Sequence, residues 1–164
     1  MESLANKMAL SIRPVTKDNW RAIARLKVRE DQNHFVASNV FSIAESHYGY
    51  DEPDGSGHWE MLPFGIYDED QPVGFLMYGL NFSNRQFEAF IIRLMVDENF
   101  QGKGYGRFGM QRMLEIFSPD SRIHNVGISY EPENEVARKL YASLGFVETG
   151  EMLEGEVIAV LHLR

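Results

Sequence analysis

The feature that most constrains the fold is the stretch Phe90 to Gly106, FIIRLMVDENFQGKGYG, in which an apolar run ends at an acid and leads into a glycine-rich segment. Residues 87–96 are predicted to form a strand, residues 104–117 a helix with one apolar face, and residues 123–130 another strand. A strand, a helix and a second strand in this order form a crossover, which requires a parallel or near-parallel strand pair. Because hairpins flank this crossover, we expect a mixed sheet.

The remaining segments predict hairpins and short helices around this crossover. Thr16 is a residue type that caps helices, and Gly145 is suited to end one. We find no internal repeat or linker, so residues 1–164 are expected to form one α/β (α+β) domain. Its sheet should be mixed and mostly antiparallel, with six or seven strands and about four helices. The other predicted strands are 10–15, 64–67, 72–80, 146–152 and 156–163, and the other helices are 16–28, 40–49 and 133–144.

Composition narrows the possible function classes. The chain has no cysteine, which excludes disulfides, thiolate metal sites and a cysteine nucleophile. Its five histidines lack close metal-ligand spacing, so we expect no metal. No window approaches the roughly 18 apolar residues of a membrane span, and the start MESLANK has no secretory apolar core, so we expect a cytoplasmic protein that binds no membrane. The net charge of −8 disfavours nucleic acid and favours a cationic small molecule as partner.

The glycines fall between a strand and a helix start. Free backbone N–H groups at a helix N-terminus attract anions, most often phosphate. Glycines allow the backbone to approach such a group closely and to adopt turn conformations that a Cβ would disfavour. The alternative is a tight turn with glycines for packing alone. The segment is neither a Walker A loop nor a dinucleotide fingerprint, so the residues by themselves indicate a phosphate-bearing cofactor of unknown kind.

Two motifs resemble the GNAT superfamily of N-acetyltransferases. Gln101 to Gly106 matches its Q/R-x-x-G-x-G/A signature, and NEVARKLYASLGF, Asn134 to Phe146, resembles its second conserved stretch. The segments 30–46, 74–79 and 93–106 further resemble bacterial spermine/spermidine (diamine) acetyltransferases. The resemblance implies acetyl-CoA as cosubstrate and a sheet splayed at its central parallel pair.

The resemblance also implies where the cofactor binds. The pantetheine arm would pair with the end of the strand before the glycines, and the diphosphate would bind the main chain of the loop and the helix start. The expected cofactor-binding residues are Leu94, Met95, Val96, Gln101, Gly102, Lys103, Gly104, Tyr105, Gly106, Arg107, Asn134 and Lys139. For the basic residues Arg138 and Lys139, a solvated helix face is the alternative.

Acetylation of a primary amine requires loss of a proton from the ammonium and protonation of the leaving thiolate. Tyr141 matches the tyrosine of the family that protonates the CoA sulfur. Many relatives carry a glutamate base on the preceding strand, but this chain has apolar residues or Arg93 there. We therefore consider Glu88, which has the strand parity of Phe90, or a chain of waters leading to Glu88, Glu131 or bulk solvent.

The acceptor is expected to be a polyamine such as spermidine or spermine. Glu30, Asp31 and Glu45 lie in the segment that covers the acceptor site in the family, and Tyr48 could stack on a cation. Two alternatives stay open: an acetyltransferase for another amine (antibiotic, amino acid or protein amine), and an acyl-CoA-binding regulatory module without catalysis. A homodimer is possible through the apolar C-terminal strand.

Overall fold

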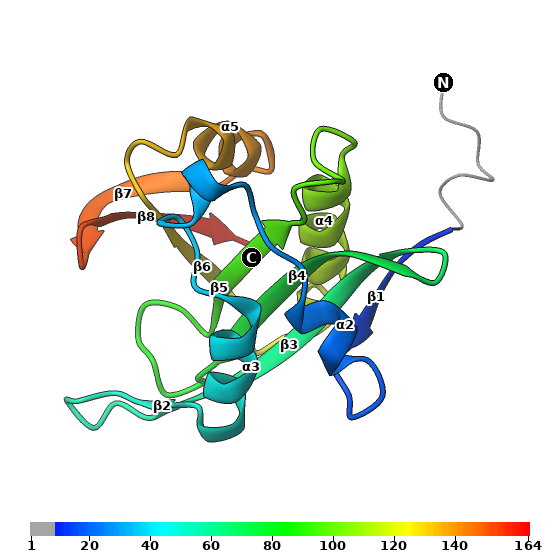
Figure 1. The fold of residues 1–164 in the computed structure, drawn as a ribbon. Helices are drawn as coiled ribbons and strands as arrows, with labels where there is room; N and C mark the ends of the chain where they lie inside the picture. Colours follow the sequence, from blue (N-terminus) through cyan, green and yellow to red (C-terminus); the bar gives the residue numbers. More distant parts are fainter. Residues whose placement is uncertain (1–8) are drawn as a thin grey trace.

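A computed structural model describes residues 9–164 (Figure 1). Within this range the chain forms an eight-stranded sheet and four α-helices. The strands are β1 Leu10–Pro14, β2 Tyr50–Asp51, β3 His58–Asp68, β4 Gln71–Leu80, β5 Ala89–Val96, β6 Asn125–Tyr130, β7 Val147–Leu153 and β8 Glu156–His162. The helices are α2 Trp20–Ala24, α3 Asn39–Tyr48, α4 Tyr105–Phe117 and α5 Glu135–Ser143, with a 3-10 turn at Glu30–Gln32.

The predicted mixed sheet is confirmed. Its strand order is β1-β3-β4-β5-β6-β8-β7, with β2 paired to β3. Strands β5 and β6 run parallel across the crossover through α4, and the other pairs are antiparallel. The parallel pairing ends early, because its three pairs run only from Ala89–Val126 to Ile91–Ile128. Beyond this point β5 stays paired with β4 and β6 with β8, so the sheet opens as a wedge.

A β-bulge shifts the register just where the wedge begins. Arg93 pairs with Met77 of β4, whereas Ile91 pairs with the next residue, Tyr78, which leaves Ile92 as the extra residue. A bulge bends a strand and redirects its side chains. Ile91 packs in the core under α4, whereas Ile92 packs against the core cluster on the opposite face.

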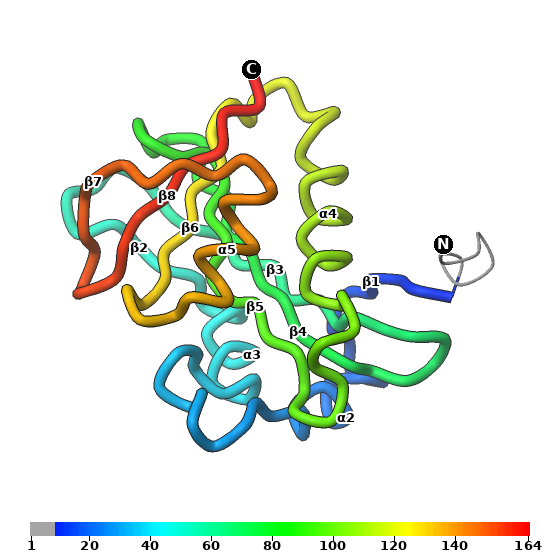
Figure 2. The backbone as a smooth tube through the Cα atoms, turned by 90° about the horizontal axis from the view of Figure 1, so that it is seen from above, coloured from blue at the N-terminus to red at the C-terminus, as the bar shows by residue number. Residues whose placement is uncertain are grey.

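The helices cover the two faces of the sheet (Figure 2). Helices α4 and α5 lie on one face and α2 and α3 on the other. Gly109 of α4 packs so closely on the sheet that an added Cβ would stand 2.7 Å from the Cδ1 atom of Ile66. On the other face Ile23 of α2 is fully buried and lies against Gly65. The apolar residues therefore form separate cores on the two faces of one sheet.

The first predicted helix is much shorter than expected. The prediction covered 16–28, but α2 spans only Trp20–Ala24. At the start, the Asn19 side chain accepts a hydrogen bond from the Thr16 backbone N–H, so Thr16 belongs to a turn rather than to a cap. At the end, the carboxylate of buried Asp97 accepts the N–H of Lys27 at 3.0 Å, and the carbonyl of Lys27 accepts the N–H of Glu98. These long-range bonds hold the chain out of helical geometry.

Strand β3 is longer than predicted. The predicted strand covered 64–67, but the observed one starts at His58. Trp59 and Met61 are buried between exposed His58 and Glu60, which is the alternation typical of a half-buried strand. The extension pairs with β2 and with residues 77–80 of β4. It places the turn between β2 and β3 beside the wedge.

Candidate functional site

A cavity of about 1260 Å³ occupies the wedge between β5 and β6. On one side it is lined by the glycine-rich loop and by α5. On the other side it is lined by the 3-10 turn region, by Glu45 of α3, by the β2–β3 hairpin and by the β7–β8 turn. Its size exceeds the roughly 300–1,000 Å³ of typical small-molecule sites. The cavity therefore has room for two ligands that meet in the opening of the sheet.

The glycine-rich loop leaves the start of α4 open. Gly102 and Gly104 have φ values of 78° and 86°, and a Cβ on either would meet no atom of residues 9–164 within 4 Å. Packing alone therefore does not explain these glycines, whereas the positive φ does. Gly104 is the N-cap of α4 and supplies no side-chain hydrogen bond, and the first turn holds no acidic residue. The first turn, residues 104–107, lines the cavity, and its free N–H groups fit an anion such as a diphosphate.

Several side chains of the loop are engaged elsewhere. The Gln101 amide donates to the carbonyl of Val96 at 3.0 Å and to the side chain of Gln32 at 2.8 Å. The Tyr105 hydroxyl donates to Asp68, and this bond, burial and the charge of Asp68 raise the pKa of Tyr105 to about 12. Lys103 does not line the cavity, and its Nζ lies 5.8 Å from the ring centroid of Phe100. The backbone of this segment, rather than these side chains, is available to a phosphate.

Some of the predicted cofactor residues on β5 and near α5 line the cavity, and others do not. Leu94, Met95 and Val96 line the wedge, on the stretch of β5 that has no pairing with β6. Asn134 also lines it, but its side chain caps α5 by accepting the N–H of Ala137 at 3.2 Å. Lys139 does not line the cavity. Arg107 does, and it donates to Ser143 at 2.8 Å, which joins α4 to α5.

Tyr141 projects from α5 into the same cavity. Its ring is 7% exposed and lies 5.5 Å from the ring of Tyr130 and 6.1 Å from that of Phe146, measured between centroids. Burial raises the pKa of the Tyr141 hydroxyl well above its ordinary value, and Tyr130 and the charge of Glu156 raise it further. Tyr141 is therefore a protonated phenol throughout the neutral range, as a proton donor must be.

The acceptor residues predicted from the sequence are only partly brought together. Glu45 lines the cavity, but it forms an ion pair with Arg93 at 3.2 Å. Glu30 and Asp31 sit in the 3-10 turn and do not line it. Tyr48, at the end of α3, is 84% exposed and also lies outside the lining. Three of the four predicted acceptor residues are thus outside the cavity lining, where the 3-10 turn region contributes Arg29, Gln32 and Asn33 instead.

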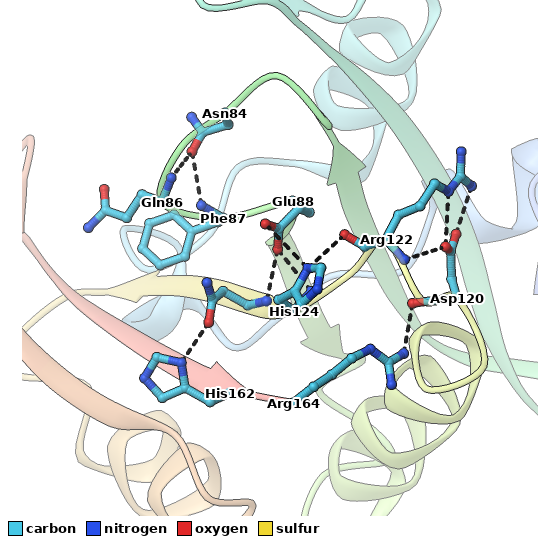
Figure 3. A network of polar contacts seen from close by, with 10 residues as sticks. Asn84, Gln86, Phe87, Glu88, Asp120, Arg122, His124, His162 and Arg164 are labelled. Atoms are coloured by element: carbon cyan, nitrogen blue, oxygen red, sulfur yellow. Dashed lines mark hydrogen bonds and ion pairs between the residues drawn. The ribbon is translucent and has the colours of Figure 1, made fainter.

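The structure gives no support to Glu88 as the base. Glu88 precedes β5, at the end of the parallel pair opposite to the wedge, and does not line the cavity. Its carboxylate accepts the backbone N–H groups of His124 at 3.0 Å and Asn125 at 2.8 Å, as Figure 3 shows. Strand parity places Glu88 on the same face as Phe90, but the sheet opens at the other end of β5. Glu88 instead fixes the start of β6 beside β5.

Three carboxylates that the sequence reasoning did not select lie in the cavity instead: Glu52, Glu154 and Glu156. None has a cationic partner within 4.0 Å in the part of the chain that the structure describes. Glu52 accepts a hydrogen bond from the indole of Trp59 at 2.6 Å, and Glu156 accepts one from the Ser129 hydroxyl at 2.5 Å. Their sequence signals were weak, since Glu52 lies in a turn-rich loop and the other two flank a hairpin glycine.

Residues 9–164 contain no group of three or more histidine, aspartate and glutamate side chains arranged to hold a metal ion. Among the helices described, none has the length and apolar character needed to cross a membrane.

Comparisons with known proteins agree with this geometry. The spermine/spermidine N(1)-acetyltransferase of Bacillus subtilis (strain 168) is 29% identical, and the alignment covers 95% of this chain and all of the relative. The spermidine N-acetyltransferase of Vibrio cholerae, solved with CoA and spermine, superposes with a TM-score of 0.69 at 19% identity, over 95% of this chain and 96% of that one. The ribosomal-protein-S5-alanine acetyltransferase of Vibrio fischeri gives a TM-score of 0.68 at 18% identity, over 94% and 93%.

These similarities confirm the resemblance to bacterial spermine/spermidine acetyltransferases and the splayed sheet expected from it. The model of the acetyltransferase (GNAT) family matches residues 19–146, which span the glycine-rich loop, the wedge and Tyr141. The chain therefore belongs to the GNAT family of acetyltransferases.

Proposed function

We propose that the protein transfers the acetyl group of acetyl-CoA directly to a primary amine of a polyamine such as spermidine or spermine, in a ternary complex. The observation that carries this proposal is the asymmetry of the cavity. One side presents free helix N–H groups suited to a diphosphate, and the other presents three carboxylates without cationic partners in residues 9–164. An anionic nucleotide and a polycation would enter such a site from opposite sides.

The residues present fit acetyl-CoA. The first turn of α4 would bind the diphosphate through backbone N–H groups, and the open edge of β5 at Leu94, Met95 and Val96 offers main-chain groups to the pantetheine amides. Acetyl-CoA supplies the activated thioester. The solved Vibrio cholerae relative was obtained with CoA. Lys103 and Lys139 could contribute only from outside the present lining.

Tyr141 is proposed to donate a proton to the CoA sulfur. A phenol with a pKa of about 10 can donate a proton to a thiolate whose conjugate acid has a pKa of about 8.5 or above. The raised pKa of Tyr141 keeps the phenol protonated at neutral pH. Tyr141→Phe should lower kcat about a hundredfold or more and leave the affinity for acetyl-CoA unchanged. Equal turnover would remove Tyr141 from the reaction.

The charge distribution supports a polyamine as acceptor. Glu45 and Arg93 neutralise each other at 3.2 Å. Glu52 stands on the β2–β3 hairpin, whereas Glu154 lies in the β7–β8 turn, so carboxylates face the cavity from two separate walls. A ligand with amines several methylene groups apart can pair with both walls, and a monoamine cannot. The pairing of each additional cation would be worth up to about 1 kcal/mol, or roughly fivefold in affinity.

Release of CoA thiol with a panel of amines tests this proposal. The panel contains spermidine, spermine, butylamine as a single-amine control, a free amino acid and a peptide with a free N-terminus. We expect kcat/KM for spermidine to exceed that for butylamine by about tenfold or more. The Glu52→Gln and Glu154→Gln variants should each reduce this preference. Preference for the peptide or the amino acid would favour another amine acceptor, and the absence of any turnover would favour a regulatory acyl-CoA-binding module.

We also propose that residues 1–164 form one domain, because strands from Leu10 to His162 belong to the same sheet. The cytoplasmic location and the homodimer stay predictions. A crystal form of the Vibrio cholerae relative is described as dodecameric, which concerns that protein.

A further inference from the structure

We propose, on the basis of the function above, that Glu156 is the group that takes the proton from the acceptor ammonium. Glu156 is the first residue of β8 and lines the wedge cavity together with Ser129 of β6. Glu156 would take the role of a glutamate on β5, where this chain has apolar residues or Arg93.

The alternation of β8 places Glu156 on the acceptor face of the sheet. Ile158 is buried in a cluster with Trp59 and Phe87, and Val160 packs against the same cluster. Glu156 shares the parity of these residues, so it points to the face covered by α3 rather than to the face covered by α4. The carboxylate of Glu52 on the β2–β3 hairpin lies on this face too, because Trp59 donates a hydrogen bond to it.

Ser129 holds this carboxylate at the opening of the sheet. The last parallel pair is Ile91–Ile128, so Ser129 is the first residue of β6 beyond it. The Ser129 hydroxyl donates to Oε2 of Glu156 at 2.5 Å, which leaves Oε1 free to accept a proton from a ligand. The carboxylate is thus fixed where the two halves of the sheet separate.

Tyr141 stands on the opposite side of the same opening. It packs in the core cluster under α4 and α5 and lines the same cavity as Glu156. The proposed base and acid therefore flank the place where the amine nitrogen and the CoA sulfur meet.

The other cavity carboxylates are less suited to this role. Glu45 is paired with Arg93, and Glu52 is held by Trp59 on the β2–β3 hairpin. Glu154 lies in the turn at φ 50° and makes no hydrogen bond that would fix its side chain in residues 9–164. Glu156 alone among the four combines a fixed carboxylate with a position at the wedge.

The proton balance is complete with these two groups. The ammonium gives its first proton to Glu156, and the nitrogen lone pair forms the C–N bond at the thioester carbonyl. When the tetrahedral oxyanion collapses, the C–S bond breaks and the thiolate takes the proton of Tyr141. The nitrogen loses a second proton to become the amide, and this proton restores Tyr141. The proton on Glu156 passes to solvent, so one proton is released per turnover.

The pH profile of kcat for spermidine tests the proposal. At pH about 7.5, Glu156→Gln should lower kcat about a hundredfold. Its kcat should then rise about tenfold per pH unit towards the amine pKa of about 10, because the free neutral amine becomes available. The wild type should reach its plateau at lower pH. Glu156→Asp, which keeps the carboxylate and guards against a folding defect of the glutamine variant, should retain the wild-type profile with partial kcat.

Glu60→Gln is the matched control, because it removes the same charge from an exposed residue outside the cavity lining. It should leave kcat, KM for spermidine and the pH profile unchanged. Glu156→Gln should bind acetyl-CoA with the wild-type Kd by calorimetry. A Glu156→Gln variant with wild-type kcat and profile, whatever its KM, would overturn the proposal.

Failure of the proposed acceptor gives a different result. If the wild type acetylates another amine of the panel but no polyamine, the acceptor assignment falls and the same variants test Glu156 with that amine. A wild type that acetylates no amine would overturn both proposals.

Discussion

Replacing Gly104 with alanine separates the conformational role of this glycine from its proposed role in binding. Gly104 has a φ of 86°, and an added Cβ would meet no described atom within 4 Å. The variant therefore introduces strain without a clash. Placing a non-glycine residue in this conformation costs about 1–2 kcal/mol. For a chain of this size that corresponds to a drop in Tm of roughly 2–8 °C.

The effect on acetyl-CoA binding should be far larger. The Cβ would project from the cap of α4, next to the N–H groups that the diphosphate would contact. Losing two hydrogen bonds to a charged ligand costs about 3–6 kcal/mol. At about 1.4 kcal/mol per tenfold, Kd should rise at least a hundredfold. Titration calorimetry with acetyl-CoA measures Kd, and differential scanning calorimetry of the free protein measures the strain.

Gly150→Ala is the control for this experiment. Gly150 has a φ of 84° and equally open surroundings, but it lies on the exposed edge strand β7. It should lose a similar amount of stability and keep the wild-type Kd. Unchanged acetyl-CoA affinity in Gly104→Ala would refute the placement of the diphosphate at α4, and a parallel loss of affinity in both variants would show that strain alone is responsible.

Three further predictions concern stability. Tyr105→Phe should lose about 1.5–3 kcal/mol at neutral pH, because Asp68 loses a donor. The pKa of Tyr105 is raised to about 12 in the folded state. Above about pH 10 the unfolded chain releases this proton and the folded chain does not, so wild-type stability should fall as the pH rises. Urea titrations should show that this part of the fall is missing in the variant. Asp97→Ala should cost about 2–4 kcal/mol by urea titration, since the Lys27 N–H loses its partner. Gly109→Ala should destabilise the folded state by about 1–3 kcal/mol through overpacking, which would appear as a lower Tm. It should leave acetyl-CoA affinity intact.

The central fold could be predicted because its determinants are local. An apolar strand, a glycine-rich loop and an amphipathic helix follow one another within residues 87–117, and the crossover rule then fixes the parallel pair. The helix that carries Tyr141 to the cavity could be predicted for a related reason, since one motif contains both Tyr141 and the capping residue Asn134. Features of this kind do not depend on which distant segment packs against them.

The shorter first helix shows where local reasoning stops. Apolar spacing in 16–28 favoured a helix, but the N–H of Lys27 is bound by Asp97, which is 70 residues away. No pattern within the segment signals such a partner. The pairing of Glu45, a predicted acceptor residue, could not be foreseen for the same reason. Its ion pair with Arg93 depends on how α3 packs on β5.

The choice of Glu88 rested on strand parity. Strand parity says which face a residue is on, but not which end of the strand opens. Here the register shows the parallel pairing at the amino-terminal ends of β5 and β6, so Glu88 lies beside the closed end (Figure 3). A carboxylate near the open end must come from a strand that reaches it, and β8 does so through its pairing with β6.

The open end of the sheet would also link cofactor binding to the fold in this chain. Along 92–96, β5 bonds to β4 on one edge and has no strand on the other. Buried main-chain groups without partners are costly, and Gln101 satisfies the Val96 carbonyl with its side chain. The same Gln101 amide bonds to Gln32 of the 3-10 turn, next to the acceptor side of the cavity. A pantetheine arm that pairs with this edge would therefore contact β5, whose last residue is linked through Gln101 to the 3-10 turn on the acceptor side. Both ligands would then contact segments that Gln101 holds together.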